Sequence, residues 1–205
     1  MTRKKKPEVV AEVVDLPSDL MNDDPLEEIP HPPVIMLYGE ISDESVAEVS
    51  NVIISSHYLK KRPEKITILL NTEGGLLHSA FALIEVITAS RIPIEIVAIG
   101  QCISAGVLIF MSGTKGMRAV TPTCTVMSHS FSTEIQGNSY DLNAIQKELK
   151  HTHERMINHY MEHTDQTRVS IETHLIGTQD RWLTPEDVVK FGIADFIKPL
   201  SLPAG

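Results

Sequence analysis

The sequence is poor in the residues that mark several common classes of protein. Its 205 residues include two cysteines, one tryptophan and only 5% aromatic residues. Cys102 and Cys124 both lie in apolar stretches, so we expect no disulfide framework, and this low cysteine content fits a reducing compartment. The hydrophobic content of 42% is ordinary for a globular domain, and the chain is long enough for a sizeable buried core.

Long apolar runs and an excess of positive charge are also missing. No run approaches the roughly 18 apolar residues of a membrane span. The basic start, MTRKKKPEVV, has no apolar segment behind it, which argues against a secretory signal. The formal net charge is −9, whereas nucleic-acid binders normally carry a basic patch. We therefore expect a cytoplasmic protein with neither nucleic acid nor a membrane as partner.

The chain divides into tails and one domain. Residues 1–33 combine prolines with acids and lack periodicity, which predicts a flexible acidic tail. The domain is expected over residues 34–200, with a short tail at 201–205. Its strand-like runs alternate with helix-like segments: strands at 34–41, 65–75, 92–100 and within 117–130, and helices at 42–61, 77–90 and 104–113. This alternation predicts an α/β fold with a parallel sheet covered on both faces.

The last third of the chain is expected to be mainly helical. Residues 138–163 carry an apolar stripe at helical spacing, formed by Leu142, Ile145, Leu149, Met156, Ile157 and Tyr160. At about 1.5 Å per residue this helix is longer than one small domain needs, so we expect it to pack against something beyond its own domain. The segment 180–197 predicts a turn, a helix with Pro185 at its first position, a stop at Gly192 and a last strand.

Ser104 stands between the strand ending at Gly100 and the apolar helix that follows. The ordinary interpretation is a small hydrogen-bonded core serine. The alternative is a nucleophile at a helix start, where free backbone N–H groups lie close to an oxyanion. The local pattern is C-x-S-x-G, which differs from the G-x-S-x-G of α/β-hydrolases.

Two further residues have both a structural and a chemical interpretation. His129 follows an apolar strand and is either an edge residue or a general base, since the ordinary pKa of histidine lies near neutral pH. Asp180 lies in a turn and is either a cap or the carboxylate that orients an imidazole. The glycines of NTEGG (71–75) form a tight turn or let a backbone amide approach a substrate.

We expect no metal and no cofactor. His159 and His163 lie four residues apart and so share one helix face, but HYMEH lacks the glutamate position of H-E-x-x-H and no third ligand is evident.

Taken together, these segments resemble the proteolytic subunit of the ATP-dependent Clp protease over residues 34 to about 198. GQCISAGVLIFMSGTKGMR is similar to that family's nucleophile segment, LNTEGG to its glycine turn, VMSHS to its histidine block, and QGNSYDLNAIQKELK to the start of its long handle helix. DRWLTPEDVVKFGIAD is similar to its aspartate-containing ending. The 25 residues from Ser104 to His129 and the 29 from Gly75 to Ser104 match the family's spacing.

The resemblance implies a ClpP/crotonase-like repeated β-β-α superhelix with a protruding handle helix, and a serine endopeptidase. Ser104 would be the nucleophile, His129 the base and Asp180 its orienting acid, with the backbone N–H groups of Gly75 and Ala105 as the oxyanion hole. Gly74 together with Ser132, Thr133 and Glu134 would bind substrate. Implied partners are unfolded polypeptides, copies of the chain in heptameric rings stacked in pairs, and an AAA+ unfoldase.

The chain departs from the family pattern at several positions. Phe131 replaces a proline, Thr133 and Glu134 replace a glycine pair, and Thr67 and Leu69 replace tyrosines that line the family's unfoldase-docking pocket. The distance from His129 to Asp180 is two residues longer than expected. Two other function classes stay open: a noncatalytic subunit that keeps the fold, and a crotonase-like acyl-CoA enzyme, which shares the fold and a glycine-based oxyanion hole.

Overall fold

The computed structural model of the chain describes residues 33–131 and 139–201. Seven strands form one sheet: β1 (Val34–Ile41), β2 (Ile66–Gly75), β3 (Ile94–Ile103), β4 (Arg118–Val120), β5 (Thr125–Ser128), β6 (Arg181–Leu183) and β7 (Phe196–Ile197). The helices of the described residues are α1 (Asp43–Ser56), α2 (Leu77–Ala89), α3 (Ala105–Met111), α4 (Ser139–Thr164), α5 (Arg168–His174) and α6 (Pro185–Lys190). Apart from Pro33 and Ser201, the expected tails at 1–33 and 201–205 lie outside the described residues.

The sheet is parallel along its main path, in the order β1-β2-β3-β4-β7. Parallel neighbours need a crossover connection, which α1 supplies between β1 and β2, and α2 between β2 and β3. β4 pairs with the first half of β3, and β5 with its last residues, Gln101–Ile103. β6 runs antiparallel to β5. The predicted α/β fold with a parallel sheet is confirmed.

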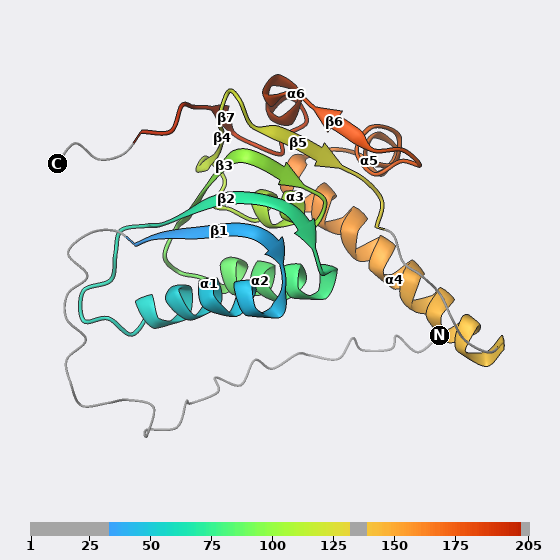
Figure 1. The fold of residues 1–205 in the computed structure, drawn as a ribbon, viewed down its shortest axis with the longest axis horizontal. Helices are drawn as coiled ribbons and strands as arrows, with labels where there is room; N and C mark the ends of the chain where they lie inside the picture. Colours follow the sequence, from blue (N-terminus) through green and yellow to red (C-terminus); the bar gives the residue numbers. More distant parts are fainter. Residues whose placement is uncertain (1–32, 132–138, 202–205) are drawn as a thin grey trace, which may run out of the picture.

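Helices cover one face of this sheet. α1, α2 and α3 lie together on that face (Figure 1), and their apolar residues join those of β1, β2 and β3 in the main core. On the opposite face, Val34, Met36 and Tyr38 of β1 are 56%, 63% and 46% exposed. The prediction that both faces are covered is therefore wrong at β1, because alternate side chains of a strand point to opposite faces and only one face of β1 has helices against it.

The termini of two helices follow their sequence signals. Ser42 caps α1 and forms a reciprocal capping box with Ser45, and Thr184 caps α6, with Pro185 at the first turn. Gly192 ends that segment with a φ of +76°, a conformation that favours glycine. No helix of the described residues is long and apolar enough to cross a membrane.

The long helix α4 has two different halves. Its second half is anchored in the core by Met156, Ile157 and Tyr160, where α4 contacts α3 and α5. Its first half runs away from the sheet (Figure 1), and Ile145 and Leu149 there are only partly buried. The predicted protruding helix is thus present, and part of its apolar stripe is incompletely covered within one chain.

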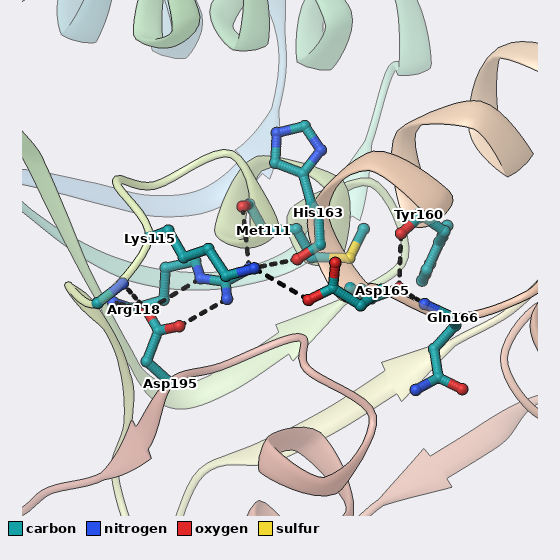
Figure 2. Close-up of polar contacts among 10 residues, drawn as sticks. Met111, Lys115, Arg118, Tyr160, His163, Asp165, Gln166 and Asp195 are labelled. Atoms are coloured by element: carbon teal, nitrogen blue, oxygen red, sulfur yellow. Dashed lines mark hydrogen bonds and ion pairs between the residues drawn. The ribbon is translucent and has the colours of Figure 1, made fainter.

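A buried ion pair joins the start of β4 to the segment that precedes β7. Arg118 at the start of β4 donates from Nε and Nη2 to the two carboxylate oxygens of Asp195, at 3.0 and 2.6 Å (Figure 2). Its Nη1 donates to the carbonyl oxygens of Met111 in α3, at 3.4 Å, and His163 in α4, at 2.9 Å. Arg118 therefore fixes β4, α3, α4 and the approach to β7 around one side chain that is only 3% exposed.

Candidate active site

Parallel pairing of β3 with β5 brings Ser104 and His129 together. Ile103 lies opposite Met127 in the register, and the Ser104 N–H donates to the Met127 carbonyl oxygen at 2.9 Å. Because parallel strands end at the same edge of a sheet, the residues that follow β3 and β5 meet there. His129 Nε2 lies 2.7 Å from Ser104 Oγ. Two side chains 25 residues apart thus form a direct hydrogen bond.

Ser104 occupies a strained backbone conformation. Its φ is 57° and its ψ is −121°, which is rare for a residue with a side chain and costs about 1–3 kcal/mol. Ser104 stands at the N-cap of α3, but its side chain caps no backbone N–H. The hydroxyl is directed to His129 instead. An ordinary capping or core serine has no need of such strain, so the conformation favours the chemical interpretation.

The antiparallel β5–β6 pair places Asp180 beside the imidazole. Ser128 lies opposite Arg181 in the register, so the residue after Ser128 and the residue before Arg181 are neighbours across the pair. Asp180 Oδ1 lies 3.3 Å from His129 Nδ1. The side chains of His129 and Asp180 are 25% and 55% exposed, which leaves this end of the arrangement open to solvent.

The glycine turn at the end of β2 packs directly against Ser104. Gly74 has a φ of +95°, and a Cβ there would lie 2.7 Å from Ser104 Cβ and 2.9 Å from the Ile103 carbonyl oxygen. At Gly75 a Cβ would lie 2.3 Å from the Ile41 carbonyl oxygen. No other residue fits either position without displacing backbone. The backbone of the turn consequently reaches the region of the Ser104 hydroxyl.

The first N–H of α3 belongs to Ala105, the residue after Ser104. Ala105 begins the helix, so its N–H has no partner within α3, and it makes no hydrogen bond to another described residue. Because α3 has only seven residues, an oxyanion beside Ser104 would be stabilised by this individual N–H donor more than by the dipole of the helix. Ser132, Thr133 and Glu134, which we expected to bind substrate, lie outside the described residues.

The two cysteines and His159 lie in the interior of the protein. Cys102 and Cys124 are buried free thiols; burial raises the pKa of both, that of Cys124 to about 12, so they stay protonated at neutral pH. His159 Nε2 donates to the Leu108 carbonyl oxygen at 2.8 Å. Within residues 33–131 and 139–201, no group of three or more potential ligands is arranged for a metal ion.

One polar pair next to His129 was missed from the sequence. The hydroxyl groups of Ser128 and Tyr160 lie 2.6 Å apart and are buried. Tyr160 belongs to the predicted apolar stripe of the long helix, and a buried tyrosine hydroxyl normally has a partner. Its burial was thus predictable, whereas the identity of the partner depends on how α4 packs against β5.

Comparisons with known proteins show which family the chain resembles. A family model described as Clp protease matches residues 19–199. The ATP-dependent Clp protease proteolytic subunit of Deinococcus radiodurans is 26% identical over 152 residues, which cover 73% of this chain and 74% of the relative.

Proposed function

The chain belongs to the Clp protease family, and we propose that it is a serine endopeptidase in which Ser104, His129 and Asp180 act as a triad. The observation that carries this proposal is the 2.7 Å hydrogen bond between His129 Nε2 and Ser104 Oγ. It supplies what a serine nucleophile needs, a base within reach of its proton. The third partner, Asp180, lies on the other side of the same imidazole.

The proposed reaction begins with proton transfer. A proton on Nδ1, held towards Asp180, leaves the Nε2 lone pair free, so Nε2 accepts the Ser104 proton as Oγ attacks the carbonyl carbon of the peptide bond. The same imidazolium then gives its proton to the leaving amine, and an acyl ester stays on Ser104. A water molecule, deprotonated by His129, hydrolyses that ester and regenerates the hydroxyl. Asp180 orients the ring and stabilises its positive charge throughout.

The oxyanion of the tetrahedral intermediate needs donors that are already in place. We assign this role to the backbone N–H groups of Gly75 and Ala105. The N–H of Ala105 lies next to Ser104 and makes no hydrogen bond to another described residue, which supports the assignment, as does the close approach of the glycine turn. Each such donor typically contributes a factor of about 10²–10³ to the rate.

Substrate choice and assembly form the second part of the proposal. The relative's name describes a proteolytic subunit of an ATP-dependent protease, so we propose that this chain acts on unfolded polypeptides in rings of seven subunits stacked in pairs, fed by an AAA+ unfoldase. A closed chamber would restrict an unselective peptidase to threaded chains. The partly buried Ile145 and Leu149 on the projecting half of α4 support burial of this half against another copy.

Cleavage by the purified protein tests the chemical proposal. A short fluorogenic peptide and an unstructured polypeptide should both be cut by the parent protein, and Ser104→Ala should abolish both activities while leaving the fold intact, because only one oxygen is removed. Turnover of Ser104→Ala within about tenfold of the parent would contradict the assignment. An intact parent that cuts nothing would instead support a noncatalytic subunit or a crotonase-like enzyme.

Light scattering tests the assembly. Replacing Ile145 and Leu149 together with aspartate puts charge into the proposed apolar contact and should cost at least several kcal/mol per interface between rings. We expect this variant to fall to single rings or smaller species and to lose activity, although Ser104 is unchanged. As a control, Ala144→Asp adds charge at an exposed neighbouring position and should leave the mass unchanged. A monomeric parent, or a double variant of unchanged mass, would overturn the assembly.

A further inference from the structure

The buried hydroxyl pair of Ser128 and Tyr160 lies next to the candidate catalytic histidine. Each side chain is 1% exposed, and the two oxygens lie 2.6 Å apart. Ser128 is the last residue of β5, directly before His129. Tyr160 comes from α4, 32 positions further along the chain. One hydrogen bond thus connects the core half of α4 to the backbone that carries the imidazole.

Ser128 stands at the junction of the segments that present the proposed triad. It pairs with Arg181 across the β5–β6 ladder, and Asp180 precedes Arg181. On its other side, Met127 accepts the hydrogen bond from the Ser104 N–H. A displacement of Ser128 therefore moves His129 relative to Ser104 and alters the approach of Asp180 at the same time.

Tyr160 is held firmly enough to act as an anchor. The neighbouring His159 donates from Nε2 to the Leu108 carbonyl oxygen of α3 at 2.8 Å, and the Thr164 hydroxyl donates to the Tyr160 carbonyl oxygen at 2.5 Å. The helix start that follows Ser104 belongs to the same α3. α4 is thus bonded to the element on the serine side and, through Tyr160, to the strand on the histidine side.

The chemistry of the pair is that of fixed neutral dipoles. Burial raises the pKa of the Tyr160 hydroxyl, so it keeps its proton and takes no part in proton transfer at neutral pH. A buried hydroxyl is costly unless it is paired, and a pair in the interior is directional. Two apolar side chains would fill this space without specifying one separation of α4 and β5.

We propose that Tyr160 is a positioning residue, which acts through Ser128 to set the approach of His129 to Ser104 and Asp180. The inference deepens the proposed peptidase function and rests on it. Tyr160 touches neither the reacting atoms nor the substrate. Its loss should lower kcat and leave KM nearly unchanged, because the binding of the peptide does not depend on the hydroxyl, whereas proton transfer depends on the alignment of the base.

The test compares Tyr160→Phe, Ser128→Ala and the double variant in peptide cleavage, with kcat corrected for the fraction of active sites titrated by a fluorophosphonate. We expect each single variant to lower kcat about tenfold. The double variant should fall no further than either single one, because both residues act through one bond. Ser56→Ala is the matched control: it removes a buried hydroxyl bond within α1, a helix that carries none of the proposed triad, so it should lower Tm and keep kcat within about twofold.

A kcat within about twofold of the parent for Tyr160→Phe, with a lower Tm alone, would show a merely structural role and overturn the inference. The inference is also overturned if Ser56→Ala loses as much kcat, or if the losses of the single variants multiply in the double variant. If Tyr160→Phe does not fold, Ser128→Ala decides by the same criteria. Failure of the proposed function has its own signature, since the parent would then show no Ser104-dependent cleavage for any variant to modify.

Discussion

Two polar clusters in this protein are built in opposite ways. In the first, Arg118 and Asp195 form a bidentate ion pair, and the guanidinium also donates to two carbonyl oxygens. In the second, Ser104, His129 and Asp180 form a chain of contacts in which the side chains of His129 and Asp180 are 25% and 55% exposed. The first cluster is closed to solvent around its guanidinium. The second is open to solvent at Asp180.

The Arg118–Asp195 cluster also keeps its carboxylate in the charged form. Burial alone would raise the pKa of the Asp195 carboxyl, but the hydrogen bonds and charge of Arg118, with the N–H of Gly116, hold that pKa below its ordinary value. The carboxylate is therefore committed to its partner. In the Arg118–Asp195 cluster, the satisfied hydrogen bonds thus stabilise the fold. The proposed chemistry instead requires a cluster that is only partly enclosed, together with the strained backbone at Ser104.

The largest expected effect is a loss of activity when the cluster of Ser104, His129 and Asp180 is disrupted. His129→Ala should lower the rate of peptide cleavage by at least about a thousandfold, because the serine hydroxyl is a weak nucleophile without its base. The free energy of unfolding should change little. His153→Ala is the matched control, since His153 lies on α4 and faces Glu172 at 4.0 Å. If His129→Ala keeps activity within about tenfold of the parent, the proposed role of His129 as the base of Ser104 is contradicted.

The next largest expected effect is a loss of stability when the ion pair of Arg118 and Asp195 is broken. Arg118→Met leaves the Asp195 carboxylate without its partner in the interior and should lower the free energy of unfolding by about 3–5 kcal/mol, measured by urea denaturation at pH 7. Arg168→Met removes two exposed ion pairs, with Glu154 and with Glu172, and should lower the free energy of unfolding far less than Arg118→Met does. Cleavage per folded molecule should survive in both. Equal costs for the two arginines would contradict the distinction drawn between them.

A smaller effect concerns a histidine that is buried rather than open. Burial, reinforced by the neighbouring His163, lowers the pKa of His159 to about 4. As the pH falls through about 6.5, the imidazole of His159 takes up a proton in the unfolded chain but not in the folded protein. The contribution of His159 to the free energy of unfolding is therefore complete above about pH 6.5 and is lost progressively down to about pH 4. Over this window the loss is roughly 3 kcal/mol.

His159→Gln keeps a donor for the Leu108 carbonyl oxygen and removes the titration. Its free energy of unfolding should therefore fall less than that of the parent when urea denaturation at pH 7 is compared with the same measurement at about pH 4.5. Parallel changes in the two proteins would show that His159 does not carry this pH dependence.

Much of the fold could be predicted because its strands and helices have strong local patterns. The runs that form β1, β2 and β3 are apolar and bounded by turn residues, and the long helix has a clear stripe. The sequence pattern does not predict α5 (Arg168–His174), because this helix is short and includes three β-branched residues, Val169, Ile171 and Thr173. β6 lies where the sequence predicts a turn, because its three residues become a strand only through their pairing with β5.

The candidate site was predicted less evenly. The spacing of the family motifs pointed to Ser104 and His129, and the structure brings these two side chains into contact. The roles of Gly75 and Ala105 stay proposals. The Ser128–Tyr160 pair carries no local signal, since its two hydroxyls meet only when α4 packs on β5. Contacts between distant elements are where a single sequence is least informative.

Covalent labelling of the native protein with a fluorophosphonate, followed by mapping of the adduct by mass spectrometry, probes the proposed nucleophile and its base together. We predict one adduct, on Ser104, formed at a rate that falls by at least about a thousandfold in His129→Ala. An adduct on another residue, no adduct on an intact protein, or an equal labelling rate in His129→Ala would contradict the proposed triad.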